Sequence, residues 1–388
     1  MKNKIFISVY QALPNFGSEN HIGFYIINKL LKEDNFDLYL FTPVENRTAI
    51  KSFYSKDYPS NLHFIDFEYS FLLNIFKPDP TKYSQYMSNI LWALNLKRYL
   101  RKNTTNFDLY YQINPSSFWS YNGLINQVRP TLLGPLMGYR MPRRGLWKYL
   151  NFPSKIFEMV RLIVIKSPYA FINKSRILKS DTHVFVGGDK NIFNNDKYIN
   201  LSHSLSIEVD KIDRIKPKTP TIILAGRFTD IKGYEIAIEA LGRVDREFIV
   251  NIYGDGPREN HIKNCIDKYN LSSKFNFKGH VSQDELIKDM SSSNLLIAPY
   301  IRDSASLLVS EALYSSLPVV TISETGPANV CSYFNPELSK ISSGVGDRLI
   351  ASLGEDITYF LDNFIDVDPK PASNFGDDII TEIKNILV

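Results

Sequence analysis

The sequence predicts an α/β protein made of two doubly wound domains. Short apolar, β-branched runs alternate with stretches in which apolar residues recur at helical spacing, and this alternation continues through both halves of the chain. The chain has 388 residues, the length of two ordinary domains. Glycine-containing turns follow strands in both halves, as they do at the ligand-binding edges of parallel sheets. We place the first domain at residues 1–205, the second at 206–370, and a final segment at 371–388.

Both halves repeat the same order of elements. In the first half, apolar runs predict strands at 4–9, 37–42, 62–66, 107–113 and 182–186. Helical spacing predicts helices at 18–32, 44–54 and 85–101. In the second half we predict strands at 221–225, 248–252, 275–277, 294–298 and 319–322. Helices are predicted at 258–268, 306–316, 347–361 and 377–387, and two more begin near residues 234 and 282. The polar, Pro-containing stretch 187–218 predicts the linker between the domains.

The segment 221–318 carries most of the chemistry. Its first strand is followed by a loop that contains Gly226, Arg227, Lys232 and Gly233, and then by a helix. The loop therefore places two cations at the carboxyl edge of a sheet, beside the free N–H groups of a helix N-terminus. Guanidinium and ammonium groups at such an edge suit a diphosphate.

Two carboxylates follow at a regular interval. Asp303 lies in a loop after a strand, and Glu311 lies eight residues later within the next predicted helix. Such a pair can accept hydrogen bonds from separate hydroxyl groups of one elongated polar ligand. Together with the cations and the glycine turn at 253–257, the carboxylates predict a nucleotide-sugar site.

This segment resembles the donor domain of family 4 glycosyltransferases. The matching motifs are GRFTDIKG at 226–233, YGDGP at 253–257, FKGHV at 277–281, and Asp303-x7-Glu311 followed by EAL and LPVV. Two departures are present: Asp303 stands for the usual Glu, and Ser304-Ala305-Ser306 stands for the usual Gly-Phe-Gly. Both lie where the family holds the donor sugar, so they bear on sugar identity more than on nucleotide binding.

The resemblance implies the GT-B fold, in which two Rossmann-like domains have parallel sheets facing across a cleft. It implies transfer with retention of anomeric configuration, and a terminal helix that crosses back to the first domain. In the implied roles, Arg227 and Lys232 stabilise the leaving diphosphate, Asp303 binds the donor sugar, and Glu311 binds the ribose. The other residues expected at the donor are Gly17, Gly226, Gly254, Gly256, Gly279, His280, Val281, Ser306, Leu307 and Leu308.

No cofactor and no metal are expected. The one Asp-x-Asp, at Asp366 and Asp368, lies near the C-terminus and away from the strand ends that carry the cations. The two cysteines, Cys265 and Cys331, lack metal-like spacing, so neither a zinc site nor a disulfide framework is predicted.

Two features of the first half remain open to two interpretations each, and a third departs from the family pattern. The turn 16–19 (FGSE), with Gly23 in the helix after it, resembles one branch of the same family but also fits an ordinary strand-to-helix loop. The stretch 132–144 resembles the acceptor-side GP-x-G-G loop of that branch but also fits a Gly/Pro turn without a ligand. Gln112 stands where family members often carry His, so no catalytic proton transfer is assigned there.

Residues 140–180 have an unusual composition. Ten Lys or Arg residues accompany one acid, Glu158, and apolar and aromatic residues are interleaved with them. The pattern fits an anionic membrane surface or lipid-linked acceptor, a solvated helix face, or RNA. A net charge of +4 is too small to indicate nucleic acid, which we do not expect as a partner. The chain opens directly on a strand and has no apolar run of ~18 residues, so we expect a cytoplasmic protein that can touch the inner face of the cell membrane.

The sequence therefore predicts a retaining, metal-independent glycosyltransferase. Its donor is expected to be a UDP- or GDP-sugar, and its acceptor a glycan or lipid-linked saccharide in surface-polysaccharide biosynthesis. Two alternatives remain: a GT-B epimerase or phosphorylase, and a non-catalytic subunit that binds a nucleotide sugar or glycan.

Overall fold

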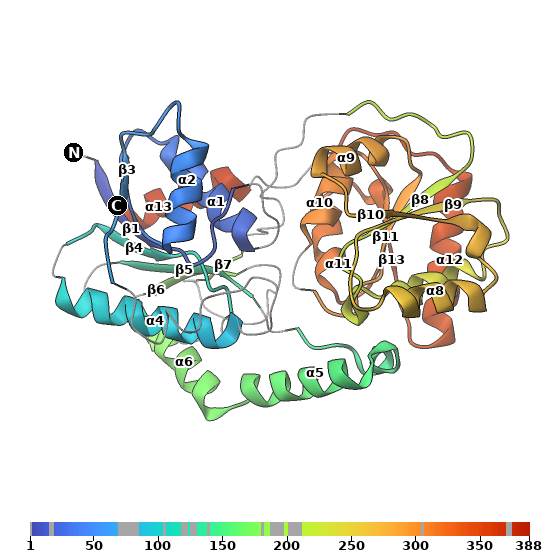
Figure 1. The fold of residues 1–388 in the computed structure, drawn as a ribbon, viewed down its shortest axis with the longest axis horizontal. Helices are drawn as coiled ribbons and strands as arrows, with labels where there is room; N and C mark the ends of the chain where they lie inside the picture. Colours follow the sequence, from blue (N-terminus) through green and yellow to red (C-terminus); the bar gives the residue numbers. More distant parts are fainter. Residues whose placement is uncertain are drawn as a thin grey trace. The chain divides into compact units, whose positions relative to one another are not determined.

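The computed structural model contains two compact units (Figure 1). It describes residues 2–14, 19–68, 85–103, 106–117, 123–124, 130–137, 140–179, 182–186, 198–200, 212–303, 306–369 and 375–388. The first unit comprises residues 1–139, 163–206 and 375–388, and the second comprises 140–162 and 207–374.

The first unit is built on a seven-stranded parallel sheet. Its order is β3-β2-β1-β4-β5-β6-β7. The strands are β1 (Asn3–Ser8), β2 (Phe36–Phe41), β3 (Leu62–Phe64), β4 (Leu109–Gln112), β5 (Thr131–Leu136), β6 (Thr182–Val186) and β7 (Tyr198–Asn200). The helices are α1 (Glu19–Leu31), α2 (Val44–Phe53), α4 (Gln85–Lys102), α6 (Pro168–Lys179) and α13 (Phe375–Leu387).

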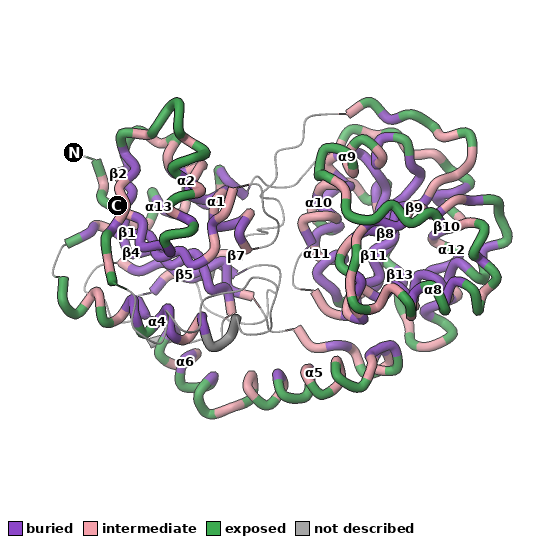
Figure 2. The backbone as a smooth tube through the Cα atoms, viewed as in Figure 1, coloured by how far each residue is buried: buried purple, intermediate pink, exposed green. Residues whose placement is uncertain are grey.

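The core of this unit is aromatic. Phe6 of β1 contacts Phe41 and Phe107, and all three side chains are buried. The fully buried Trp92 of α4 donates its indole N–H to Ser8 Oγ at 3.2 Å, which gives its one polar atom a partner. Because both faces of a parallel sheet are covered, its strands are buried along most of their length, as the purple tube in Figure 2 shows.

The second unit has a six-stranded parallel sheet. Its order is β10-β9-β8-β11-β12-β13. The strands are β8 (Thr221–Ala225), β9 (Ile249–Tyr253), β10 (Phe275–Gly279), β11 (Leu295–Ala298), β12 (Val319–Ile322) and β13 (Ser339–Ser342). The α-helices are α5 (Phe152–Ile165), whose last turn falls in the first unit, α7 (Tyr234–Leu241), α8 (Glu259–Lys268), α9 (Gln283–Ser291), α10 (Leu307–Tyr314), α11 (Gly326–Cys331) and α12 (Asp347–Asp362).

Helix α12 illustrates how the sequence pattern produces these elements. Its buried residues include Leu349, Leu353, Ile357 and Phe360, which recur at helical spacing and join the core cluster of the second unit. Helix α9 begins where the capping box predicts, because Ser282 Oγ accepts from the main-chain N–H of Glu285 at 3.2 Å. The predicted α/β class with two parallel sheets is confirmed.

Three stretches differ from the sequence prediction. Residues 140–162, which we assigned to the first domain, cluster with the second unit. Residues 131–136, predicted as part of a turn region, form the buried strand β5. The predicted linker 187–218 contains the short strand β7, which pairs with β6. In each case a partner distant in sequence, which local pattern does not reveal, determines the conformation.

The C-terminal helix α13 belongs to the first unit. It packs on α1, where the rings of Tyr25 and Phe375 lie 6.1 Å apart and Lys384 pairs with Glu33 at 2.6 Å. Figure 1 shows α13, in red, among the blue N-terminal elements.

Candidate functional site

The candidate donor site lies at the carboxyl edge of the second sheet. Strands β10, β9, β8 and β11 are neighbours there, and all four run in the same direction. Their carboxyl ends therefore lead into four adjacent loops, at 279–281, 254–256, 226–233 and 299–303. This adjacency brings together motifs that lie up to about eighty residues apart in the chain, as parallel topology predicts.

Main-chain hydrogen bonds hold two of these loops together. Phe228 N–H donates to Asp255 O at 2.7 Å, and Arg258 N–H donates to Phe228 O at 3.1 Å. A Cβ on Gly254 would lie 2.3 Å from the carbonyl oxygen of Gly226, and the φ of Gly254 is +113°. Only glycine permits this approach without a shift of the backbone. The turn YGDGP is therefore a packing requirement of the loop that carries the cations.

Lys232 is the central cation of the site. Its Nζ lies 2.9 Å from Asp303 Oδ2 and 3.8 Å from the centre of the Tyr300 ring. The side chains of Lys232 and Asp303 are 23% and 25% exposed, so the pair is reachable from solvent. Burial alone would lower the pKa of Lys232, but Asp303 and Tyr300 outweigh it and the pKa is raised. Lys232 is therefore a fixed positive charge.

This pairing differs from the separate roles that the motifs imply. Lys232 was expected to face phosphates and Asp303 the sugar hydroxyls, whereas the structure joins them in one ion pair. An ammonium has three N–H donors, and Asp303 occupies one of them. Asp303 is also held through its main chain, because its carbonyl accepts from the N–H of Gly326 at 3.0 Å.

Arg227 is the second predicted cation. Its side chain is exposed, and among the described residues no acid lies within ion-pair distance of it. Its neighbour Gly226 lies beside Lys232, since a Cβ on Gly226 would lie 3.8 Å from Lys232 Cε. Arg227 thus extends from the same loop as the fixed cation, with its guanidinium open to an incoming anion.

Glu311 is held by a residue that sequence analysis did not assign to the site. Its Oε1 accepts from Gln283 Nε2 at 2.7 Å. Burial raises the pKa of Glu311, and the hydrogen bond from Gln283 partly opposes this shift. Gln283 opens α9, directly after the Ser282 cap, and its place just beyond the FKGHV motif was the available signal.

The remaining predicted donor residues lie in the same loops or outside the described chain. Ser306 caps α10 by accepting from the N–H of Val309 at 3.4 Å, and Leu307 and Leu308 form the first turn of that helix. Gly279 has a φ of +67° and leads to the exposed His280 and to Val281. Gly17, Ser304 and Ala305 lie outside the described residues.

Buried ion pairs join residues 140–162 to the loops of this site. Glu158 of α5 is 1% exposed; its Oε1 pairs with Arg302 Nε at 2.8 Å and its Oε2 with Arg161 Nη1 at 3.2 Å. Arg302 directly precedes Asp303. Glu158, the only acid beside the ten bases of residues 140–180, is thus a buried anchor for the loop that carries Asp303. The sequence shows Glu158 as a single acid among bases, but it does not show that Arg302 is the ion-pair partner of Glu158.

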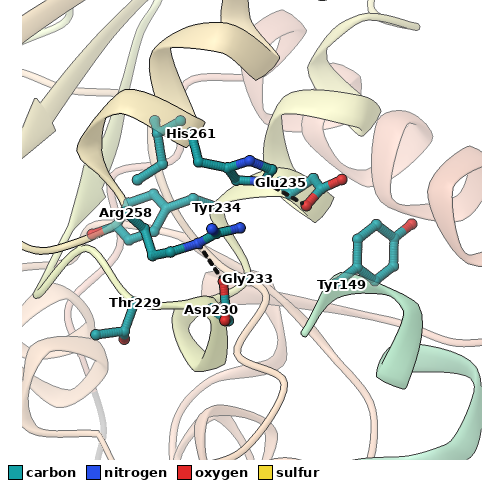
Figure 3. A pocket seen from close by; sticks show the side chains of 9 residues that line it. Tyr149, Thr229, Asp230, Gly233, Tyr234, Glu235, Arg258 and His261 are labelled. Carbon is teal, nitrogen blue, oxygen red and sulfur yellow. Dashed lines mark hydrogen bonds and ion pairs between the residues drawn. The ribbon is translucent and has the colours of Figure 1, made fainter. Parts of the chain in front are cut away.

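A second anchor holds the loop that carries Lys232. Asp230 Oδ2 accepts from the main-chain N–H of Asn151 at 3.1 Å and from Ser154 Oγ at 2.7 Å, and its Oδ1 pairs with Arg258 Nε at 2.5 Å. Figure 3 shows the Asp230–Arg258 pair. Residues 140–162, which we call the strap, therefore contact the loop that carries Asp303 through Glu158 and the loop that carries Lys232 through Asn151 and Ser154.

The first unit also places polar groups at the carboxyl edge of its sheet. Ser116, after β4, donates its hydroxyl to Glu19 Oε1 at 2.5 Å, and burial raises the pKa of Glu19. Asn114 Oδ1 accepts from the N–H groups of Tyr10 and Gln11 at 2.7 and 3.0 Å. Gln112, to which no catalytic role was assigned, is buried. Gly138 of the predicted acceptor-side loop lies outside the described residues.

Part of the second unit is similar to known proteins. Residues 206–336, which include all the donor-site loops, match the family model Glycosyl transferases group 1. A curated relative, 2-deoxystreptamine glucosyltransferase from Streptomyces kanamyceticus, is 25% identical over 156 residues. That alignment covers 39% of this chain and 38% of the relative, so it spans well under half of either protein.

Solved structures identify the fold of the whole chain. The lipopolysaccharide outer core galactosyltransferase WaaB is similar with a TM-score of 0.60 and 13% identity, over 99% of both chains. The Anabaena protein HepE, solved in complex with UDP-glucose, is similar with a TM-score of 0.55 and 12% identity, over 98% of this chain and 99% of that chain. The chain thus has the GT-B fold that its motifs predicted.

Proposed function

We propose that this protein is a retaining family 4 glycosyltransferase. It transfers a sugar from a UDP- or GDP-sugar to a glycan or a lipid-linked saccharide, in the biosynthesis of a surface polysaccharide. The observation that carries the proposal is Lys232, a fixed cation at the carboxyl edge of the sheet, within the segment that matches group 1 glycosyltransferases.

Sugar transfer produces a nucleoside diphosphate as the leaving group. Negative charge grows on its oxygens as the glycosidic bond breaks, so a cation fixed beside those oxygens stabilises the transition state more than the ground state. Lys232 is held by Asp303 and Tyr300 and needs little reorganisation for this task. Arg227 adds a guanidinium that can grip two phosphate oxygens. These two cations supply the charge that a metal would otherwise provide, so we propose that transfer is metal-independent.

The two acids take the hydroxyl groups of the donor. Glu311 has a second carboxylate oxygen beside the one that Gln283 occupies, and we assign it to the ribose. Asp303 is shorter than the usual Glu and already bound to Lys232, so it meets the donor sugar with one oxygen close to the cation. We expect this arrangement to favour a donor whose hydroxyl groups approach the diphosphate closely.

A nucleotide-binding screen tests the proposal. UDP or GDP should raise the melting temperature, and the increase should grow with the logarithm of the nucleotide concentration. At a concentration a hundredfold above the Kd, binding should add about 2.7 kcal/mol to the free energy of unfolding. A saccharide acceptor should then accelerate nucleotide release from the matching nucleotide sugar. Turnover without any acceptor would indicate an epimerase, and dependence on free phosphate a phosphorylase. Binding without turnover would indicate a binding subunit, and binding of no nucleotide would refute the site.

We also propose that α5 attaches the protein to an anionic membrane. The helix has an inverted pattern: its buried residues are Glu158 and Arg161, whereas large apolar side chains are exposed. Phe152 is 75% exposed and Ile163 69% exposed. With Ile156, Met159 and Val160, these two side chains recur at helical spacing and form one apolar face. Figure 2 shows the exposure along α5.

Basic residues near the apolar face of α5 favour binding to an anionic membrane. Lys155 lies on α5, and Arg144 and Lys148 lie just before it. Apolar residues that enter the acyl boundary, together with bases that meet lipid phosphates, are typical of interfacial helices. Among the described residues, no helix combines the length and the hydropathy needed to cross a bilayer.

Vesicle co-sedimentation tests the attachment. The protein should bind vesicles that contain phosphatidylglycerol and bind pure phosphatidylcholine weakly. Phe152→Ser and Ile163→Ser should each weaken binding by about tenfold, because each removes on the order of 1–2 kcal/mol of apolar burial. Ile215→Ser, at an equally exposed apolar residue of the second unit, is the matched control. Equal binding by all three variants would argue against α5 as the attachment site.

A further inference from the structure

Helices α7 and α8 bring together three side chains of different metal-binding chemistry. Glu235 lies in the first turn of α7, and His261 and Cys265 lie one turn apart on α8. His261 Nε2 is 3.0 Å from Glu235 Oε2 and 3.6 Å from Cys265 Sγ. The three ligand atoms all lie within 4.8 Å of one another. Figure 3 shows the His261 ring directed at Glu235.

These distances fit the edges of a tetrahedron around one metal ion. With metal bonds of ~2.0 Å to nitrogen or oxygen and ~2.3 Å to sulfur, tetrahedral ligands lie roughly 3.3 Å apart for N and O, and roughly 3.5 Å apart for N and S. The observed His261–Cys265 distance is close to the second value, and the His261–Glu235 distance is slightly below the first. Glu235 is partly exposed, so its side chain can rotate to close the third edge.

We propose that Glu235, His261 and Cys265 form a binding site for a divalent transition metal of the zinc class. Thiolate and imidazole favour such ions over magnesium and calcium, which prefer oxygen ligands. One thiolate and one carboxylate balance the charge of the ion. The geometry leaves a fourth position, as in zinc sites that keep a water ligand.

The surroundings of the cluster fit this assignment. Glu235 and His261 line a small pocket together with Tyr149, Thr229 and Arg258. Arg258 is the cation that faces the pocket, and its charge is matched by Asp230. Burial, and then Glu235, raise the pKa of the Cys265 thiol, so a metal has to displace its proton.

The proposed ion would cross-link helices α7 and α8, because its ligands come from both. Helix α7 follows the loop that carries Lys232, and α8 follows the glycine turn that packs on that loop. The ion would fasten these helices to each other without touching the donor cations, so the proposal is independent of sugar transfer. The expectation of no zinc site rested on the spacing of the two cysteines and on the absence of histidine clusters in the sequence. The i, i+4 pair His261 and Cys265 was the signal, and Glu235 joins it only in the tertiary structure.

Cobalt titration tests the site in the full-length protein. Protein freed of metal with a chelator should show a thiolate-to-cobalt charge-transfer band and the visible bands of tetrahedral Co²⁺, and Zn²⁺ should displace both signals. Cys265→Ser should abolish the charge-transfer band. Cys331→Ser is the matched control, because it removes the other buried cysteine, which lies on α11.

Two further variants keep the test decisive if Cys265→Ser fails to fold. Glu235→Gln and His261→Ala change partly exposed side chains and should each weaken Zn²⁺ binding more than tenfold, since losing even an outer-sphere partner costs that much. Zn²⁺ should also raise the melting temperature of the parent protein, and less so that of the variants. The proposal is refuted if Co²⁺ gives no charge-transfer band, or if the band survives in Cys265→Ser.

Discussion

Lys232→Ala should lower kcat by about 10²–10³-fold, the usual cost of removing one group that stabilises transition-state charge. The ammonium is fixed between Asp303 and the Tyr300 ring, so its loss removes the positive charge that faces the phosphates and the Asp303 carboxylate. The negative charge of Asp303 would then no longer be offset by Lys232 and would repel the phosphates. We expect the melting-temperature shift with UDP or GDP to disappear in this variant, while the far-ultraviolet spectrum of the folded protein is kept.

The control for this experiment is a lysine in a similar local environment. Lys340 of β13 also lies over a tyrosine ring, that of Tyr359 at 4.1 Å, but it is outside the four loops of the site. Lys340→Ala should leave kcat and nucleotide binding within about twofold of the parent. Asp303→Asn removes the negative charge beside Lys232 but keeps a hydrogen-bond acceptor there. It therefore distinguishes the effect of the charge of Asp303 from its effect on the position of Lys232. Full activity in Lys232→Ala would show that the cation of the leaving group lies elsewhere, with Arg227 the first residue to examine.

Glu158→Gln should destabilise the second unit by about 3–5 kcal/mol, the range for breaking a buried ion pair from one side. The substitution keeps the volume of the side chain but removes the charge that balances two guanidinium groups. Arg161 is 5% exposed and Arg302 is 22% exposed, so neither recovers full hydration in the folded state. A functional loss should accompany the loss of stability, because Arg302 is covalently next to Asp303.

Urea unfolding and thermal melts, followed in the full chain, measure this effect. Glu355→Gln on α12 is the isosteric control, since Glu355 is exposed and its substitution should change stability by less than about 0.5 kcal/mol. If Glu158→Gln melts within a degree of the parent, the two arginines have other partners in solution. In that case the Glu158–Arg302 ion pair would not hold residues 140–162 against the loop that carries Asp303.

The sequence alone determined the class of the fold and the loops of the donor site. Parallel strands that are buried on both faces have nearly continuous apolar sequences. The strands β8, β9, β10, β11 and β12 could therefore be predicted from the local pattern. The motifs after them carry the required glycines, because a backbone that approaches within 2.3 Å of a would-be Cβ tolerates no other residue. Such requirements are local, and a single sequence records them.

The tertiary structure alone decided which side chains became partners. Lys232 and Asp303 were both predicted, but as separate ligands of one donor, and their ion pair spans seventy-one residues. Glu158 appeared as an exception in a basic stretch, and only the packing of α5 shows that it is the buried partner of Arg302. In the same way His261 and Cys265 share one face of α8, but Glu235 comes to them from α7. An ion pair or ligand set forms where the backbone brings side chains within a few ångströms, and here the tertiary structure of the second unit brings together segments that are distant in sequence.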